Sequence, residues 1–361
     1  MLKYEFKINE LKWPFKLIII DECSTIGRDL YEHIKAAHRS INFSPILLFL
    51  GDVNQLPPVK EQNSLIFDDN LPQVELTQIV RAKNKKMADL YRNILDRNTK
   101  YYFPFCFVEK DFVEQKWDRF MQVYYESIMA GEDSLCLAYS NKKCDEINHY
   151  IKTLRDPKFV AEPAATNKGY WSSGATSIAI GDRIVVDQPL YEPVLIQTAE
   201  GYTINGCTEK MIYSGEVLEV INMESSKIAT VLNQQFFILS KYGAHFSGTI
   251  LTVRSISDGQ AFKICWLDRK QIGTSLFMAR KKLSEREYGN LYTIFNKTYS
   301  SISYGYAITI YKSQGSTYAK VWVDLSNIYY CFKGRNDEKT MYRSIYTAVT
   351  RAAEDVFMYW S

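Results

Sequence analysis

The stretch Leu17-Ile18-Ile19-Ile20-Asp21-Glu22-Cys23-Ser24 decides the fold class. Its four consecutive aliphatic residues predict a buried strand of a parallel sheet, because strands covered on both faces carry continuous rather than alternating apolar residues. Asp21 and Glu22 follow at the carboxyl end of that strand, where open α/β sheets carry their chemistry. Two adjacent carboxylates are costly to bury unless a cation or a reaction uses them. The stretch therefore predicts an α/β protein with an acidic site at the end of its first strand.

The next 60 residues continue this alternation of strands and helices. Apolar residues at helical spacing, Leu30, Ile34 and Ala37, predict a helix after the acidic pair. The aliphatic run at 46–50 predicts a second buried strand, and the prolines that close the segment 51–58 force an exposed turn at its end. A third, short strand is expected at 74–76.

The middle of the chain has a different texture from its two flanks. From 181 to about 267 it consists of short β-type runs separated by Gly, Asn and Ser, which predicts a small antiparallel barrel inserted into an α/β domain. On either side, the expected elements are helices at 85–97 and 111–130, a strand at 135–139, a helix at 276–297, a strand at 307–309, a helix after Gly315, a strand at 321–325, a helix at 341–350 and a strand at 356–359.

The composition excludes several classes of protein. With 361 residues and a net charge of +3, the chain is long enough for two or three domains, and any nucleic-acid surface has to be a local basic groove. No apolar run is long enough to span a membrane, and the N-terminal residues lack the apolar core of a signal peptide. The seven cysteines are dispersed and the four histidines do not cluster, which indicates reduced thiols and no structural zinc. We expect a cytoplasmic protein (in the host cytoplasm if viral) that is not secreted and has no membrane partner.

Polar groups recur at the predicted strand ends in a fixed order: Asp21-Glu22, Gln55, Arg81, the segment 309–317 and the segment 349–351. Three patterns among them are jointly specific, namely Gly-Asp-x-x-Gln-Leu-x-Pro from 51, Lys-Ser-Gln-Gly from 312 and Ala-Val-Thr-Arg from 348. In this order the chain resembles a superfamily 1B DNA helicase of the RecD/Dda type, phage-like, from motif II to motif VI. The resemblance covers essentially the whole chain.

This resemblance implies a site for ATP and Mg²⁺. Asp21 would hold Mg²⁺, and Glu22 would act as general base or orient the attacking water. Gln55 would sense the γ phosphate, and Arg81 and Arg351 would be catalytic guanidinium groups that reach the same phosphate. Each has a plainer alternative: a solvated loop for the acidic pair, a turn residue for Gln55, a surface ion pair for Arg81 and a helix C-terminal cation for Arg351.

The segment that resembles motif V would link the nucleotide to single-stranded DNA. Gln314 and Gly315 would approach the nucleotide. The residues implied in DNA contact are Ser140, Asn141, Thr309, Tyr311, Lys312 and Ser313. The family commonly has His where this chain has Tyr311, which keeps an aromatic face. For Ser140 and Asn141, simple helix capping is an equal alternative.

The implied fold is two RecA-like P-loop NTPase domains, the first truncated at its N-terminus, with the small antiparallel β-barrel inserted in the second. The expected domain ranges are 1–80 for the end of the first RecA-like domain, 81–180 and 296–361 for the two segments of the second, and 181–295 for the barrel with a helical subdomain. An incomplete first sheet would leave apolar side chains such as Ile18 and Ile20 exposed to water.

The phosphate loop Gly-x-x-x-x-Gly-Lys-[Ser/Thr] is absent from the sequence, which contains no Gly-Lys dipeptide. We therefore expect the C-terminal part of an ATP-dependent 5′-to-3′ DNA helicase of replication, recombination or repair, inactive alone, which needs a missing N-terminal half or a split subunit. The alternative is a non-catalytic single-stranded nucleic-acid-binding or scaffold protein derived from a helicase.

Overall fold

The computed structural model divides the chain into two compact units, one made of Met1–Glu114 with Ser313–Ser361 and the other of Gln115–Lys312. This division follows compactness and does not coincide with the four domain ranges expected from the sequence, which stay a prediction. The structure describes residues 15–39, 45–95, 117–159, 177–198, 201–230, 246–266, 277, 280, 281, 284, 285, 288, 289, 292, 297–300, 302–335 and 337–360. The expected helix at 276–297 and the first residues of the one at 111–130 fall partly outside them.

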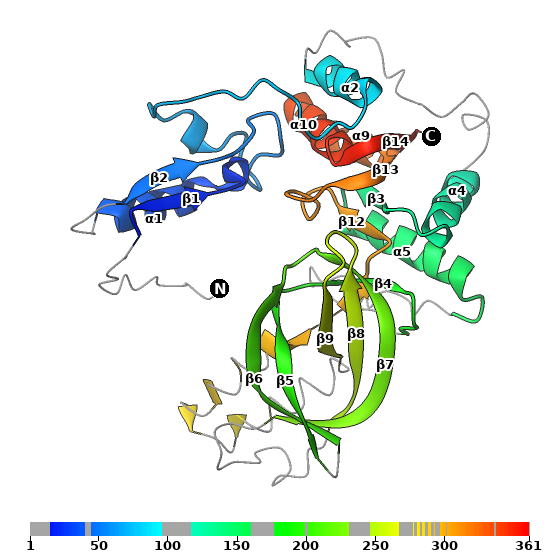
Figure 1. The fold of residues 1–361 in the computed structure, drawn as a ribbon. Coiled ribbons are helices and arrows are strands. Elements are labelled where there is room, and N and C mark those ends of the chain that lie inside the picture. Colours follow the sequence, from blue (N-terminus) through cyan, green and yellow to red (C-terminus); the bar gives the residue numbers. More distant parts are fainter. Residues whose placement is uncertain are drawn as a thin grey trace. The chain divides into compact units, whose positions relative to one another are not determined.

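The first unit begins with a small parallel sheet. Strand β1 (Leu17–Ile20) pairs with β2 (Ile46–Phe49) in the register Leu17↔Ile46, and helix α1 (Arg28–Arg39) connects them (Figure 1). The two expected parallel strands are confirmed. The short 3₁₀ helices η1 (Cys23–Thr25) and η2 (Leu65–Phe67) complete this part.

The prediction that these strands are buried on both faces is wrong. Leu17, Ile19, Ile46 and Leu48 form an outward face with 48%, 57%, 70% and 42% of their surface exposed. Only the opposite face packs, against a core cluster of Cys23, Ile26, Tyr31 and Ile66. Helix α1 and η2 cover one side of the sheet, so a continuous aliphatic run here has an alternating environment. Ile18 and Ile20 are half-buried, and their neighbours Leu17 and Ile19 are the exposed pair.

Helix α1 is confirmed, and it packs inward with Tyr31 and with Ile34 of the expected set, whereas Leu30 does not. Tyr31 is buried at 2% exposure, its ring meets Phe49 edge-on at 5.9 Å, and its hydroxyl donates to Asp69 Oδ2 at 2.7 Å. Leu30 is 49% exposed. The large aromatic ring fills the space under the sheet better than the shorter leucine does, because it supplies more buried area.

The rest of the first unit is a second α/β element. Strand β13 (Tyr318–Asp324) pairs in parallel with β14 (Ala352–Tyr359), with helices α9 (Leu325–Phe332) and α10 (Glu338–Val349) between them. Helix α2 (Lys85–Leu95) packs on α10 and β14. The rings of Trp322 and Phe357 stack across the strand pair at 4.2 Å, so Trp322 is a core residue.

Two predictions about this unit are wrong. Residues 71–80 form no regular structure, and Val74 and Leu76 are 91% and 89% exposed where a strand was expected. No helix follows Gly315: this residue, at φ +79, lies in a turn, and the next apolar residues form β13. Helix α9 starts later, where the side chain of Asp324 accepts the backbone N–H of Asn327 at 2.9 Å.

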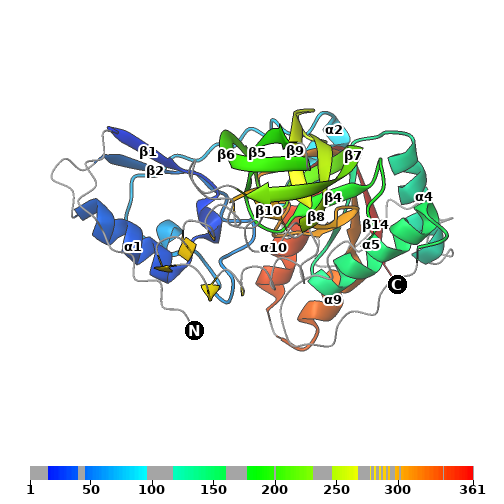
Figure 2. The same cartoon turned by 90° about the horizontal axis from the view of Figure 1, so that it is seen from below.

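The second unit contains a parallel strand pair backed by two helices. Strand β3 (Ser134–Ala138) pairs with β12 (Ala307–Thr309), and helices α4 (Trp117–Met129) and α5 (Asn141–Arg155) lie side by side next to them (Figures 1 and 2). The side chain of Asn148 satisfies both backbone groups of Ala307, accepting its N–H at 2.7 Å and donating to its carbonyl at 3.0 Å. This contact fixes α5 against the strand.

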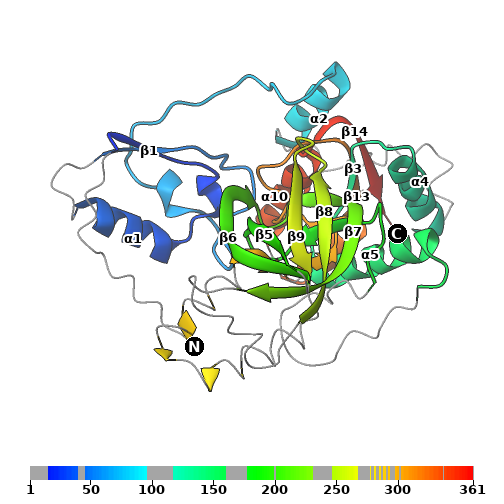
Figure 3. The ribbon, with the colours of Figure 1, turned by 60° about the horizontal axis from the view of Figure 1, so that its bottom comes forward.

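An eight-stranded, mostly antiparallel sheet forms the remainder of the second unit, in the order β10-β9-β8-β7-β4-β11 with β5 and β6 attached through β7. Its strands are β4 (Arg183–Val186), β5 (Leu190–Thr198), β6 (Gly201–Ile212), β7 (Val217–Thr230), β8 (Phe246–Ser255), β9 (Ala261–Trp266), β10 (Tyr299–Ser300) and β11 (Ile302–Tyr304). The sheet curls strongly (Figure 3), and β5 approaches β9, where Lys263 N–H donates to Glu192 Oε1 at 3.0 Å.

A fully buried ion pair connects these parts of the second unit. Lys152 Nζ on α5 lies 2.6 Å from Asp182 Oδ2, just before β4. Asp182 Oδ1 also accepts the hydroxyl of Tyr306 at 2.8 Å and lies 3.2 Å from Arg155 Nε. Buried carboxylates need such partners. Among the described helices, none is long and apolar enough to cross a membrane.

Candidate functional site

The acidic pair after β1 lies in a tight, strained loop. Glu22 has φ 51 and ψ 39, a left-handed conformation that costs a residue with a side chain about 1–2 kcal/mol. Asp21 Oδ1 accepts the backbone N–H of Glu22 at 2.8 Å, and Thr25 Oγ1 donates to the carbonyl of Glu22 at 2.9 Å. Asp21 is exposed and Glu22 half-buried. Strain of this kind is concentrated at functional sites.

The end of β2 sets the position of this loop. The backbone N–H of Cys23 donates to the carbonyl of Leu50 at 2.9 Å. A Cβ atom on Gly51 would lie 2.6 Å from Cys23 Sγ and 3.1 Å from Ser24 N, so only glycine lets the two strand ends approach this closely. Burial and the nearby acidic pair raise the pKa of the Cys23 thiol to about 11, which keeps it protonated.

The segment after Gly51 docks on α10 within the same unit. Tyr346 OH donates to Asp52 Oδ2 at 3.0 Å, and the backbone N–H of Leu56 donates to Thr347 Oγ1 at 3.1 Å. Burial and then the carboxylate of Asp52 raise the pKa of Tyr346. Gln55 lies in a turn between these two anchors, where its N–H donates to the carbonyl of Asp52 at 3.0 Å. Gln55 is therefore a turn residue, as the plainer alternative predicts, and this position does not exclude contact of its side chain with a nucleotide.

Two arginines converge at the C-terminal end of α10. Arg351 is fully buried, and its guanidinium donates to the carbonyls of Thr347 at 3.1 Å and Ser316 at 3.3 Å. Arg81 Nη1 donates to the carbonyl of Thr350 at 2.9 Å. Burial and then the charge of Arg81 lower the pKa of Arg351 to about 10. Burying a charged guanidinium group beside a second one costs folding free energy unless an anion lies next to both.

Two of the predicted nucleotide residues, Glu22 and Gly315, lie next to each other, and the charge of Glu22 acts on Arg351. Glu22 is the acid whose charge opposes the lowering of the Arg351 pKa. A Cβ on Gly315 would lie 3.8 Å from Glu22 Oε1, so Glu22 and Gly315 are neighbours. In the described part of the chain, the buried atoms Gln55 Oε1 and Gln314 Nε2 have no hydrogen-bond partner. Buried polar atoms left in this state fit a ligand that supplies the missing partners.

These contacts also bear on the plainer alternatives. Arg81 is held by a backbone carbonyl, and neither it nor Arg351 forms a salt bridge with an acid in the described ranges. Arg351 does donate to the Thr347 carbonyl in the last turn of α10, as a helix C-terminal cation would. This hydrogen bond is compatible with a second role of its charge in the site.

The residues expected to contact nucleic acid lie at the carboxyl ends of β3 and β12 or just beyond them. Ser140 caps α5, its Oγ accepting the N–H of Lys143 at 3.2 Å, and Asn141 is exposed as the first residue of that helix. Thr309 is 8% exposed, and its Oγ1 accepts the N–H of Lys312 at 3.3 Å. Ser313 is fully buried.

Of this group, Asn141 is exposed, and Ser140, Tyr311 and Lys312 are half-buried. The ring of Tyr311 is half-exposed and meets Tyr139 edge-on at 6.3 Å. Lys312 Nζ lies 3.7 Å from Asp187 Oδ1. The boundary between the two units falls after Lys312, inside the segment 309–317. An aromatic ring beside a lysine is a surface that suits both the bases and the phosphates of a single strand.

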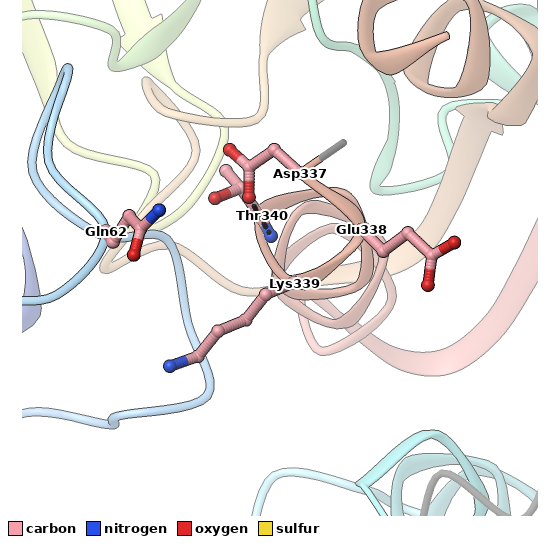
Figure 4. Close-up of a pocket in the computed structure, with 5 residues that line it drawn as sticks. All are labelled: Gln62, Asp337, Glu338, Lys339 and Thr340. Carbon is pink, nitrogen blue, oxygen red and sulfur yellow. Dashed lines mark hydrogen bonds between the residues drawn. The ribbon is translucent and has the colours of Figure 1, made fainter. Parts of the chain in front are cut away.

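Figure 4 shows a separate pocket of about 340 Å³ in the first unit, lined by Gln62, Asp337, Glu338, Lys339 and Thr340. Asp337 caps α10 there by accepting the N–H of Thr340 at 3.2 Å, and Glu338 points away from the other side chains. Lys339 Nζ lies 3.1 Å from Asn63 Oδ1. None of the predicted site residues lines this pocket.

For a metal, the described residues offer no group of three or more His, Cys, Asp or Glu side chains. A single carboxylate such as Asp21 fits Mg²⁺, which is commonly held by one or two carboxylates with water and phosphate oxygens. It does not fit an all-protein metal cage.

Sequence reasoning missed three residues that shape the site. Tyr91 on α2 donates its hydroxyl to the carbonyl of Ala352, next to Arg351, and burial raises its pKa to about 12. Asp52 anchors Tyr346, and Asp187 faces Lys312. Asp52 could have been found from its place in the Gly-Asp pattern, whereas Tyr91 is one apolar-face residue among several.

Several known proteins are similar to this chain. Residues 304–359 match the UvrD-like helicase C-terminal domain. The chain is 24% identical to an uncharacterised protein of Acanthamoeba polyphaga mimivirus, over 94% of this chain and 73% of that protein. It is 23% identical to the ATP-dependent DNA helicase Pif1 of Campylobacter jejuni, over 90% of this chain and 66% of the relative. The chain therefore spans about two thirds to three quarters of these proteins.

Solved structures of Pif1 helicases are also similar to it. The Candida albicans enzyme aligns with 96% of this chain at a TM-score of 0.49 and 15% identity, over 73% of its own length. A Bacteroides enzyme in complex with ADP-AlF3 and single-stranded DNA aligns with 96% of the chain at 0.46 and 14%, over 70% of its length. The similarity is therefore to helicases, through the domain match at 304–359 and the Campylobacter relative, and the described fold is mixed α/β.

Proposed function

We propose that this chain forms the part of an ATP-dependent 5′-to-3′ DNA helicase that runs from motif II to motif VI, of the RecD/Dda type. Its two RecA-like domains and inserted barrel would couple ATP hydrolysis to movement along single-stranded DNA. The observation that carries the proposal is the fully buried Arg351 beside the half-buried Arg81, neither with an acid salt-bridge partner in the described ranges. The charge of Glu22 acts on Arg351, and Gly315 lies next to Glu22. Two converging guanidinium groups suit the charge that spreads over a transferring phosphoryl group.

In this proposal, the residues of the first unit have different roles in ATP hydrolysis. ATP supplies the phosphoryl group, and Asp21 would hold Mg²⁺ together with phosphate oxygens of ATP. Glu22, held in its left-handed conformation, orients the attacking water or takes its proton. Arg351 and Arg81 stabilise the negative charge, and the unsatisfied amides of Gln55 and Gln314 complete the hydrogen bonds around it.

The phosphate loop is the part of the site that this sequence does not contain. Without the loop lysine and hydroxyl, the β and γ phosphates lack their backbone cradle and the metal lacks a ligand. We propose that a segment outside this sequence or a separate subunit supplies the loop, and that this chain on its own does not turn over ATP.

The test uses the protein that contains both parts, found by reading the coding sequence upstream of the Met1 codon and its neighbouring genes. We expect ATP hydrolysis stimulated by single-stranded DNA, lowered about 10³-fold in kcat by Arg351→Lys. Glu22→Gln is expected to retain bound ATP without hydrolysing it. Arg92→Lys, on an exposed arginine of α2, is the matched control and should change kcat less than about twofold. An ATPase unaffected by Arg351→Lys would refute this site.

A second candidate function follows from the absent phosphate loop, namely a non-catalytic single-stranded nucleic-acid-binding or scaffold protein. It predicts that no phosphate-loop partner exists, and that DNA binding is indifferent to ATP and to Glu22→Gln. The helicase proposal predicts nucleotide-dependent DNA binding in the complete protein. The same binding assay, run with and without nucleotide, therefore decides between them.

A further inference from the structure

Lys312 in the second unit is held by residues of the antiparallel sheet. Asp187, directly after β4, lies with its Oδ1 atom 3.7 Å from Lys312 Nζ. The side chain of Asp187 is only 8% exposed and that of Lys312 is 34% exposed. The ammonium group is therefore the partner that reaches solvent, and the carboxylate lies behind it.

Neighbouring residues fix the carboxylate. Ser303 Oγ on β11 donates to Asp187 at 3.1 Å from Oδ1, and Ser214 Oγ donates to the Asp187 backbone carbonyl at 3.1 Å. Asp187 thus keeps hydrogen bonds that do not depend on Lys312. Its charge can stay in place when the lysine moves to another anion.

The turn between β6 and β7 holds the lysine backbone from the other side. Gly215 has φ +83, and a Cβ on it would lie 3.1 Å from the Lys312 carbonyl oxygen and 3.2 Å from Lys312 Cβ. The position therefore requires glycine both for its conformation and for its space. With the backbone fixed here, the long side chain is the mobile part, and the charge of Asp187 decides where it rests.

At 3.7 Å, Lys312 Nζ and Asp187 Oδ1 form an ion pair but not a hydrogen bond. This ion pair therefore uses none of the three N–H donors of the ammonium group. Resting on the proposed function, and on the expectation that Lys312 contacts single-stranded DNA, we propose that Asp187 is a positioning residue that acts as a built-in counter-ion. It holds Lys312 while no DNA is bound and yields it to a phosphate. Because Lys312 must leave Asp187 to bind a phosphate, its net affinity for each phosphate is lower. A motor that releases DNA at every step needs such reduced affinity.

A built-in counter-ion leaves a measurable trace in the salt dependence of binding. A lysine that neutralises a single-strand phosphate normally contributes about 0.7 to the slope of log affinity against log salt, through released counter-ions. A lysine already paired with a carboxylate contributes little, because the carboxylate takes up a cation when the lysine leaves. Removing the charge of Asp187 should restore the missing contribution.

The experiment measures binding of the whole chain to a fluorescent oligo(dT) by anisotropy over a series of salt concentrations. Asp187→Asn, which can still accept the Ser303 hydroxyl, is expected to bind roughly two- to fivefold more tightly at low salt and with a slope steeper by about 0.7. Adding Lys312→Gln to it should remove that extra slope. Ser303→Ala keeps both charges and should leave the slope unchanged.

Glu219→Gln is the control for net charge, because Glu219 pairs with Arg254 at 2.6 Å away from this segment. It should change the slope by less than half as much. Equal effects of Asp187→Asn and Glu219→Gln, or weaker binding by Asp187→Asn, overturn the inference while the proposed function stands. No binding by the wild-type chain or any variant overturns the DNA-binding part of the proposed function, and this inference with it.

Discussion

Replacing Lys152 by methionine should destabilise the second unit more than any surface change. Lys152 Nζ lies 2.6 Å from Asp182 Oδ2, and both side chains are fully buried. The substitution keeps most of the aliphatic volume and removes the ammonium group alone. Asp182 is then left as a buried carboxylate with one cation fewer.

The size of the effect follows from the remaining partners of Asp182. Breaking a buried ion pair by removing one partner costs about 3–5 kcal/mol. Arg155 Nε stays 3.2 Å away, and the Tyr306 hydroxyl and the Ala179 N–H still donate at 2.8 Å and 2.7 Å. These contacts place the cost near the lower limit, at about 3 kcal/mol. For a unit of this size that corresponds to a fall in Tm of about 6–12 °C.

The assay is urea unfolding followed by far-ultraviolet circular dichroism, with a thermal scan as a second measure. The double variant Lys152→Met with Asp182→Asn should recover part of the loss, since it removes both charges. Because the pair is buried, the loss should hardly change with added salt. A cost below about 1 kcal/mol, the range of exposed pairs, would refute the claim that this buried ion pair connects α5 to the residues before β4.

Three further predictions concern the first unit. Gly51→Ala should lower the free energy of unfolding by about 1–3 kcal/mol. Adding Cys23→Ala to it should restore part of that loss, because Cys23 Sγ is the atom closest to the added methyl group. Urea unfolding of the single and the double variant measures both effects. Cys23, with its pKa raised from 9.0 to about 11, carries roughly a hundredfold less thiolate than an ordinary cysteine between pH 7 and 9, so peptide mapping after alkylation should find it unmodified when half-buried Cys207 has reacted. Ile19→Thr, on the outward face of the β1–β2 sheet, should change stability by less than about 0.5 kcal/mol in the same unfolding assay, and a loss of several kcal/mol would show that this face is covered.

The sequence by itself determined the local features of this protein. The aliphatic runs at 17–20 and 46–49 predicted two parallel strands, and the short β-type runs predicted the antiparallel region, because such patterns reflect the period of the element in which they lie. The order of Asp21, Glu22, Gln55, Gly315 and Arg351 along the chain also predicted a shared site, through the resemblance to a helicase.

Only the tertiary structure decided which of these groups meet and which faces are covered. The exposed side of β1, the turn where a helix was expected after Gly315 and the lack of a strand at 74–76 depend on what packs against each segment, and a local pattern carries no record of its neighbours. The same holds for Arg81 beside Arg351, 270 residues apart in number, and for Asp187 behind Lys312. Pairings over such separations arise when the chain buries its apolar surface, and the charges then take the partners that packing leaves within reach.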